Sequence, residues 1–378
     1  MRNATGFLLG LSILTLGLRA QIVPARQDEM TWDGPRVVVS HPGTSTFRIH
    51  VPGQGYPTEF RAPESSWDLH FREGAAFCLR KEAEGTRQDA RVLLMSTNLQ
   101  TWTRYGSFQD RDAHLVHCYP LDDHRFFLVA LPSKPFRLGN KVSPFAIGRM
   151  NQGGNIETLE LTNLGFPKPL LVKTRADRFA LDPAYEYLHT AILHPSPFVP
   201  LRDGFALVAD QVGVFWIFDG KGRLRRRIKL YNSVSEERLA QRDSLEQAVL
   251  GCQPREDGQI LIASRTEEAV LNARRQFPRD ESLEAFRDPE ARKEAARQEQ
   301  KSLEAFPELK WHLLDPDAGT VNPTDPPLKV KDHFDEVSEI LRFKFRFLPN
   351  GNLRFGDEDP APASREAKTR DREDPRLR

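Results

Sequence analysis

Short apolar runs separated by turns rich in proline, aspartate and glycine recur along the 378 residues, and this pattern constrains the fold more than any other feature. An Asp-Gly or Asn-Gly pair between two apolar runs is a strong hairpin signal, because glycine accepts the positive φ that a tight turn requires. Such turns, or looser forms of them, lie at Glu73-Gly74, Asp122-Asp123-His124, Asp203-Gly204, Asp257-Gly258 and Asn350-Gly351. The chain is therefore expected to consist mainly of antiparallel strands.

A second hairpin is expected shortly after each of the first four. Its turns fall at residues 98–100, 153–154, 219–222 and 317–319, and the last of these leads towards a strand at 328–332. Each unit then reads strand, turn, strand, loop, strand, turn, strand, which describes a four-stranded antiparallel sheet. Repetition of such a sheet along one chain predicts an all-β fold, the β-propeller.

The spacing of the turns supports a repeat. Gly74 and His124 are 50 residues apart, and Gly204 and Gly258 are 54 apart. The longer interval between His124 and Gly204 holds about 30 extra residues, which could be a long loop or a degenerate sixth unit around residues 169–173 and 185–193. We therefore predict a five- or six-bladed propeller.

The two ends of the repeat region each supply two strands. Residues 36–51 form one candidate hairpin without a preceding pair, and residues 340–356 form another without a following pair. Joined in one sheet, they would complete a blade, close the ring and remove exposed strand edges. The sequence thus predicts a propeller closed by N- and C-terminal strands.

Two segments resemble known propeller repeats. Residues 200–228, PLRDGFALVADQVGVFWIFDGKGRLRRRI, resemble NHL-type repeats, with Asp210 at the end of the strand before the second hairpin. Residues 96–102 look like a degenerate Asp-box hairpin, with Asn98 in place of the aspartate. The resemblance implies an architecture and a structural turn in which Trp102 packs between strands; it implies no activity.

A helical insertion is expected at about residues 265–307, within a late blade. Thr266 is a suitable N-cap, and Asp288 followed by Pro289 is a second helix start that should run to Phe306. A charged surface excursion is the favoured interpretation of this insertion, and a lid or a partner-docking arm is the alternative. A shorter helix is expected after Ser233, which begins a capping-box pattern.

The chain termini differ in composition from the repeat region. Residues 1–20 have the charge, apolar run and small final residue of a secretory signal peptide, which predicts export to the periplasm or the extracellular space. Residues 21–34 are expected to be a linker, residues 35–356 the propeller, and residues 357–378 a disordered charged tail. No integral membrane segment is expected after cleavage of the signal.

Charge and cysteine content argue against a nucleic-acid-binding protein and against a disulfide-stabilised scaffold. With 54 Lys and Arg against 53 Asp and Glu, the chain lacks the basic excess of a nucleic-acid-binding protein. Cys78, Cys118 and Cys252 are too few for a disulfide scaffold, and buried thiols are the favoured interpretation. A bond between Cys118 and Cys252 is not expected, because equivalent positions in different blades are too far apart; a bond between Cys78 and Cys118 stays open.

Histidine and aspartate residues gather near the second turn. His117, Asp122 and His124, with His114 and Asp123 nearby, are weak candidates for metal ligands. Neighbouring strand residues point to opposite faces, however, and an aspartate in the turn has a sufficient structural role. No metal site and no cofactor are therefore favoured.

The sequence does not select catalytic or binding residues. It lacks a glycine-rich phosphate loop and a Gly-x-Ser-x-Gly motif. The favoured hypothesis is an exported propeller that acts as a binding or interaction module for a protein or carbohydrate partner. The alternative is a propeller enzyme, such as a glycoside hydrolase or lyase, with two or three carboxylates at one mouth of the channel. A structural envelope protein is a third hypothesis.

Overall fold

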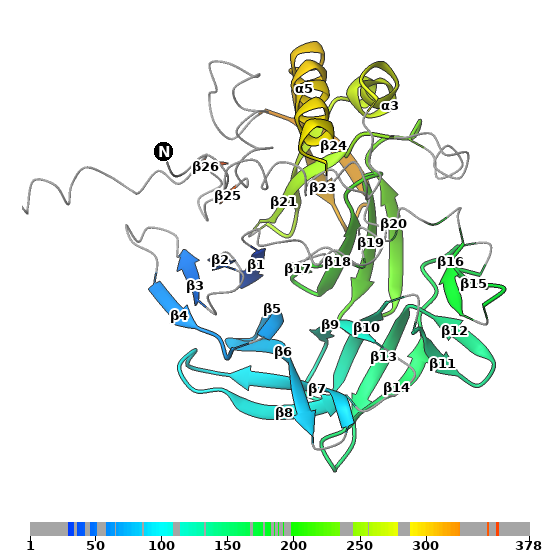
Figure 1. The fold of residues 1–378 in the computed structure, drawn as a ribbon. Coiled ribbons are helices and arrows are strands. Elements are labelled where there is room, and N and C mark those ends of the chain that lie inside the picture. Colours follow the sequence, from blue (N-terminus) through cyan, green and yellow to red (C-terminus); the bar gives the residue numbers. More distant parts are fainter. Residues whose placement is uncertain are drawn as a thin grey trace, which may run out of the picture.

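The computed structural model describes most residues between Glu29 and Asp325 and two short strands beyond them (Figure 1). The residues outside the description are 1–28, 34–35, 42–45, 51–57, 65, 85–86, 109–113, 132–133, 167–168, 177, 183–184, 186–187, 189–191, 193–197, 235–244, 256, 279–287, 326–345, 348–352 and 355–378. The predicted signal peptide, the helix expected after Ser233 and the predicted charged tail fall there.

Five four-stranded antiparallel sheets follow one another along the described chain. The first contains β1 (Glu29–Asp33), β2 (Arg36–His41), β3 (Thr46–His50) and β4 (Thr58–Arg61). The second contains β5 (Ser66–Arg72), β6 (Ala75–Glu84), β7 (Arg87–Ser96) and β8 (Thr103–Phe108). The third contains β9 (Leu115–Pro120), β10 (Arg125–Ala130), β13 (Phe145–Met150) and β14 (Ile156–Leu161).

The last two sheets have the same meander order. The fourth contains β17 (Phe198–Leu201), β18 (Gly204–Ala209), β19 (Val214–Asp219) and β20 (Leu224–Lys229). The fifth contains β21 (Val249–Pro254), β22 (Ile260–Arg265), β23 (Leu309–Asp315) and β24 (Thr320–Thr324). The predicted unit of two hairpins is confirmed in the second, third and fourth sheets, and the fifth has the same order with a different last strand.

Three smaller hairpins accompany the sheets. They are formed by β11 (Phe136–Leu138) with β12 (Lys141–Ser143), β15 (Leu171–Lys173) with β16 (Phe179–Leu181), and β25 (Arg346–Phe347) with β26 (Leu353–Arg354). The segment for which a long loop or a degenerate sixth blade was expected contains a two-stranded hairpin among the described residues.

Hydrophobic layers between successive sheets form the core. Strand residues alternate between faces, so that Ala76 and Cys78 pack towards the first sheet while Phe77 and Leu79 pack towards the third. The largest layer lies between the third and fourth sheets and stacks Phe205 on Phe218 with ring centroids 4.8 Å apart. Another layer joins the fourth and fifth sheets. This face-to-face series of sheets is a propeller-type arrangement.

Figure 1 shows the sheets fanned around a common centre, with the first strand of each nearest to it. β5 contacts both β1 and β9 there, and β17 contacts β1 and β21. The centre is therefore formed by the first strands of different sheets, and residues distant in sequence meet at this place.

The expected joint sheet of the two chain ends is not formed by the described residues. β2 and β3, within residues 36–51, pair with β1 and β4, while β25 and β26 pair with each other. β1 also lies inside the segment expected to be a linker, residues 21–34. The physical reason is local: two residues separate β1 from β2 in the sequence, and pairing of near neighbours has a lower entropic cost than pairing with a distant chain end.

The fifth sheet brings a further correction. Its fourth strand is β24, directly after Gly319, and residues 328–332, which were expected to supply this strand, lie outside the described residues. The register pairs Asp315 with Thr320, so the turn returns the chain at once.

The helical insertion is confirmed between β22 and β23. It contains α3 (Glu267–Gln276), capped by Thr266, and α5 (Pro289–Ala305), capped by Asp288 with proline at its first turn and ending at Phe306. Among the residues that the structure describes, no helix has the length and apolar content of a membrane-spanning segment. Cys78, Cys118 and Cys252 are free thiols.

Candidate functional site

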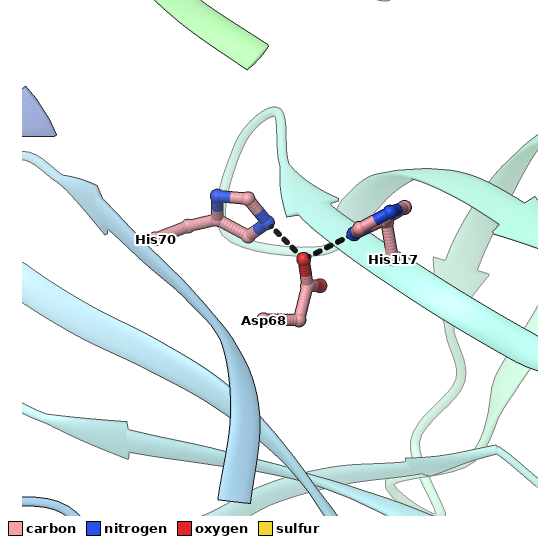
Figure 2. Close-up of side chains that lie close together, drawn as sticks. All are labelled: Asp68, His70 and His117. Carbon is pink, nitrogen blue, oxygen red and sulfur yellow. Dashed lines mark hydrogen bonds and ion pairs between the residues drawn. The ribbon is translucent and has the colours of Figure 1, made fainter. Parts of the chain in front are cut away.

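A carboxylate and two imidazoles converge between the innermost strands of the second and third sheets. Asp68 and His70 come from β5 and His117 from β9, and Figure 2 shows both rings directed at one carboxylate oxygen. The exposed fractions are 3% for Asp68, 1% for His70 and 2% for His117. The three side chains are therefore buried inside the protein and do not face solvent.

An irregularity in β5 aims the carboxylate at β9. The pairing of β5 with β6 shifts register between Trp67 and His70, and Asp68 has a φ of +59°. A bulge of this kind re-aims a side chain, and aspartate is among the few non-glycine residues that adopt the left-handed region. Because such a conformation costs free energy, it persists only where surrounding contacts determine it.

Both carboxylate oxygens of Asp68 have hydrogen-bond partners at short distances. Its Oδ1 lies 2.7 Å from His70 Nε2 and 2.5 Å from His117 Nδ1. Its Oδ2 accepts a hydrogen bond of 2.7 Å from the backbone N–H of Cys118. One carboxylate thus connects two side chains and one backbone group.

Side chains from the same segment of β5 form hydrogen bonds with backbone groups at the inner edge of β9. β9 pairs with β10 on one side, which leaves the other edge without a strand partner among the described residues. The Trp67 indole N–H donates to the carbonyl of Val116 at 2.9 Å, beside the bond from Cys118 to Asp68. Side chains here replace the missing strand, as buried backbone groups require.

The electrostatics of Asp68 combine opposing effects. Burial by itself favours the neutral carboxyl group, but the charge attraction and hydrogen bonds of His70 and His117 outweigh it and hold the pKa of Asp68 well below its usual value. Around the cluster, His70 lies edge-on to the rings of Tyr119 and Phe198 at 5.2 and 5.4 Å. The carboxylate therefore lies in an apolar, aromatic surrounding.

The three weak metal candidates from the sequence do not meet in one place. Asp122 accepts backbone hydrogen bonds from His124 and Arg125 and also binds the Arg125 guanidinium, so it shapes the turn. The side chain of His124 is exposed. Only His117 belongs to the central cluster, where its hydrogen-bond partners are Asp68 Oδ1 and the carbonyl oxygen of Ile192.

Sequence reasoning did not single out Asp68 and His70. A usable signal exists: two polar residues two positions apart interrupt an apolar strand, which places them on the same face. The convergence with His117 could not be read from that signal, because it depends on the bulge in β5 and on contact between two sheets.

A second feature is a cavity of about 540 Å³ beside the fifth sheet. Its lining combines aromatic, imidazole and aliphatic surfaces with a few polar groups, from residues Tyr231, Glu267, Leu309, Lys310, Trp311, His312, Pro323 and Thr324. Glu267 begins α3, so the helical insertion contributes directly to the wall. The volume is that of a small-molecule site.

Two of the lining residues, Tyr231 and His312, make polar contacts with residues outside the lining. The Tyr231 hydroxyl donates to the carbonyl of Arg265 at 2.5 Å, and Ser264 Oγ lies 3.3 Å from His312 Nδ1. Burial raises the pKa of Tyr231, and burial together with the charge of Lys310 lowers the pKa of His312. Both side chains therefore favour their neutral forms.

Ser264 and His312 do not form an activated nucleophile. Ser264 is fully buried, and its hydroxyl also lies 3.1 Å from the carbonyl of Lys310, which can only accept a hydrogen bond. A hydroxyl engaged with a carbonyl is not directed at the imidazole as a general base requires. The pair is a structural contact behind the cavity wall.

Comparisons with known proteins give structural likeness without a family. No family model matches the sequence, and no curated protein matches it. The structure is similar to Hsv2 from Kluyveromyces lactis, with 12% identity, 64% of this chain and 71% of that chain covered, and a TM-score of 0.31.

Two further solved structures show the same level of likeness. A protein of unknown function from Bacteroides caccae has 9% identity, coverage of 65% and 74%, and a TM-score of 0.31. A streptogramin B lyase has 10% identity, coverage of 80% and 69%, and a TM-score of 0.31. The description of this chain as propeller-type therefore rests on its own strand order and core layers.

Proposed function

We propose that this protein is an exported binding module that holds a small ligand in the cavity between Tyr231, α3 and the fifth sheet. The observation that carries the proposal is the composition of the lining, in which aromatic and aliphatic walls meet a few polar groups at a volume of about 540 Å³. Small-molecule sites combine apolar walls with a few placed polar groups in this way.

The lining favours a ligand with one apolar face and several hydroxyl groups, of which a sugar ring is an example. Tyr231, Trp311 and Pro323 offer apolar surface. Glu267 can accept hydrogen bonds, while Lys310 and Thr324 can donate them. Hydroxyl groups of a sugar can add to the existing contacts of Glu267 with Ser233 Oγ and of Lys310 with Glu308, so a carbohydrate ligand is preferred over a purely apolar one.

Binding is favoured over catalysis because Glu267 is the single carboxylate in the lining. Glycoside hydrolysis ordinarily needs two carboxyl groups on opposite sides of the scissile bond. Asp68, the carboxylate of the central cluster with His70 and His117, is buried away from solvent. A glycoside hydrolase or lyase remains the alternative function, and detection of product would favour it.

The test is a screen of mono- and oligosaccharides by thermal shift and calorimetry on the exported chain. Thr324→Phe places a ring in the cavity and should weaken binding at least about 10-fold, and Glu267→Gln should weaken it by about 10-fold, the value of one hydrogen bond to a charge. Glu290→Gln on the exposed side of α5 is the matched control and should bind normally. Equal binding by the parent and Thr324→Phe proteins would reject the cavity as the site.

Export is proposed from residues 1–20 and has its own test. Expression with these residues should yield a secreted or periplasmic protein whose first residue is Gln21, as read by intact mass and N-terminal sequencing. A cytoplasmic protein of full mass would contradict it without bearing on the cavity.

A further inference from the structure

We propose that Asp68, His70 and His117 form a site for one divalent transition-metal ion of the zinc class, at the centre of the fold. The potential ligand atoms of the three residues all lie within 4.8 Å of one another, and all three side chains are buried. Two imidazole nitrogens and one carboxylate oxygen are a ligand set that suits zinc and its neighbours. The site is separate from the cavity and does not depend on the proposed ligand.

The hydrogen-bond inventory of His117 calls for a cation at this point. Its Nε2 lies 2.7 Å from the carbonyl oxygen of Ile192, so this nitrogen must carry the hydrogen. In a neutral imidazole, Nδ1 then carries a lone pair, and it points at a lone pair of Asp68 Oδ1 at 2.5 Å. Such an arrangement is stable only if a positive charge, either a proton or a metal ion, lies between the two atoms.

Three potential metal ligands converge at this point. His70 Nε2 is directed at the same oxygen as His117 Nδ1, at 2.7 Å (Figure 2), so one carboxylate oxygen and two imidazole nitrogens lie close enough to share one ion. An ion with ligands at roughly 2.0–2.2 Å would separate the ligand atoms to about 3.3 Å in a tetrahedral site. Each imidazole nitrogen would therefore move away from Asp68 Oδ1 by less than about 1 Å, while the two nitrogens already lie within 4.8 Å of each other.

The outer contacts already have the arrangement of a metal site. His117 donates its second ring N–H to the carbonyl of Ile192, and the second oxygen of Asp68 accepts from the N–H of Cys118. Such contacts fix the tautomer and orientation of metal ligands. The left-handed backbone of Asp68 adds a local conformational cost, of the kind that concentrates at functional sites.

Burial indicates a structural ion. The ligands come from the innermost strands of two successive sheets, and through Ile192 the cluster reaches the segment that precedes β17. An ion here would hold three parts of the chain together at the centre, where interstrand hydrogen bonds end. The three ligands are far apart in the unfolded chain, which therefore does not bind the ion. The free energy of metal binding then adds to the free energy of unfolding of the protein.

The experiment measures metal on the mature full chain, first as purified without chelator and then after dialysis against Zn²⁺ or Co²⁺. We expect about one ion per chain, as in mononuclear zinc sites, and a visible Co²⁺ absorption band of a site with imidazole ligands. Removal of the ion by a chelator should lower Tm, and added Zn²⁺ should restore it. A folded parent chain that takes up neither ion would overturn the proposal and leave a shared proton as the bridging charge.

Variants locate the ion. His70→Gln and His117→Gln keep a polar side chain of similar size and should weaken metal affinity at least about 100-fold, while the exposed His124→Gln is the control and should bind normally. Unchanged binding by both folded variants would overturn the assignment. If a variant does not fold, X-ray absorption of the Co²⁺-loaded parent decides, because two imidazole ligands are expected and none would contradict the site.

Discussion

Glycine residues in the hairpin turns serve two different needs. Gly204 has a φ of +155°, and a Cβ atom there would lie 1.9 Å from the carbonyl oxygen of Phe218 in the paired strand β19. Gly74 has a φ of +79° with open space around the same position. The first glycine allows two backbones to approach, and the second only supplies a left-handed turn.

This difference predicts unequal effects of one substitution. Gly204→Ala should lower the free energy of unfolding by at least about 3 kcal/mol, because backbone must move to remove the clash. Gly74→Ala should cost about 1–2 kcal/mol, the price of a left-handed alanine. Urea denaturation of both variants checks the order, and equal losses would show that the turns are equivalent.

The titration of His312 should make the stability of the protein depend on pH. Its pKa is lowered in the folded state, by burial first and then by the charge of Lys310. The unfolded chain therefore binds protons more readily than the folded one just below the usual pKa of histidine, about 6.5. Stability from this residue should be complete above that pH and should fall as the pH decreases through the folded pKa.

The measurement is Tm between pH 7.5 and 5, compared for the parent and His312→Gln proteins. The parent should lose Tm more steeply below about pH 6.5, and the variant should show a flatter profile. The same slope in both proteins would mean that other groups cause the loss.

At the scale of elements, the helices were predictable because their signals are local. Thr266 accepts from the N–H of Ala269, and Asp288 accepts from the N–H of Glu290, as their positions before each helix indicate. The sequence did not show that α3 joins the core. Val270 and Ala273 are fully buried, and Val270 belongs to the same core layer as residues of the third and fourth sheets.

A buried ion pair fixes α3 to the segment before β21. Arg274 Nε lies 2.8 Å from Glu246 Oε2, with 7% and 1% of the two side chains exposed. Removing one partner of a buried ion pair is strongly destabilising, so Glu246→Leu should cost about 3–5 kcal/mol. Adding Arg274→Leu to that variant should recover much of the loss.

A double-mutant cycle by chemical denaturation measures this coupling. The exposed pair of Glu290 and Lys293 on α5 is the control, and its loss should change stability by less than about 1 kcal/mol. Additive effects of the two substitutions at Glu246 and Arg274 would show that the pair does not anchor the helix.

At the scale of the molecule, the repeat was predictable and the closure was not. The turns at residues 73–74, 122–124 and 203–204 mark strand pairs that the structure contains. Pairing between the two chain ends has no comparable local signal, because the sequence of a hairpin does not specify which distant strand pairs with its edge. The central cluster was hidden for the same reason, because Asp68 and His117 are 49 residues apart and meet only when two sheets pack.

The strand order makes a prediction about the C-terminal residues. All strands of the five four-stranded sheets lie between Glu29 and Thr324, and the core layers that join the sheets lie in the same interval. A chain that ends at Asp325 should therefore keep all of this pairing and unfold in a cooperative transition within a few degrees of the full chain. Circular dichroism and scanning calorimetry of the two proteins compare them. If residues 340–356 complete a sheet with residues 36–51, as the sequence suggested, the shortened chain will instead lose cooperativity, because β1 to β4 cannot then be the native partners.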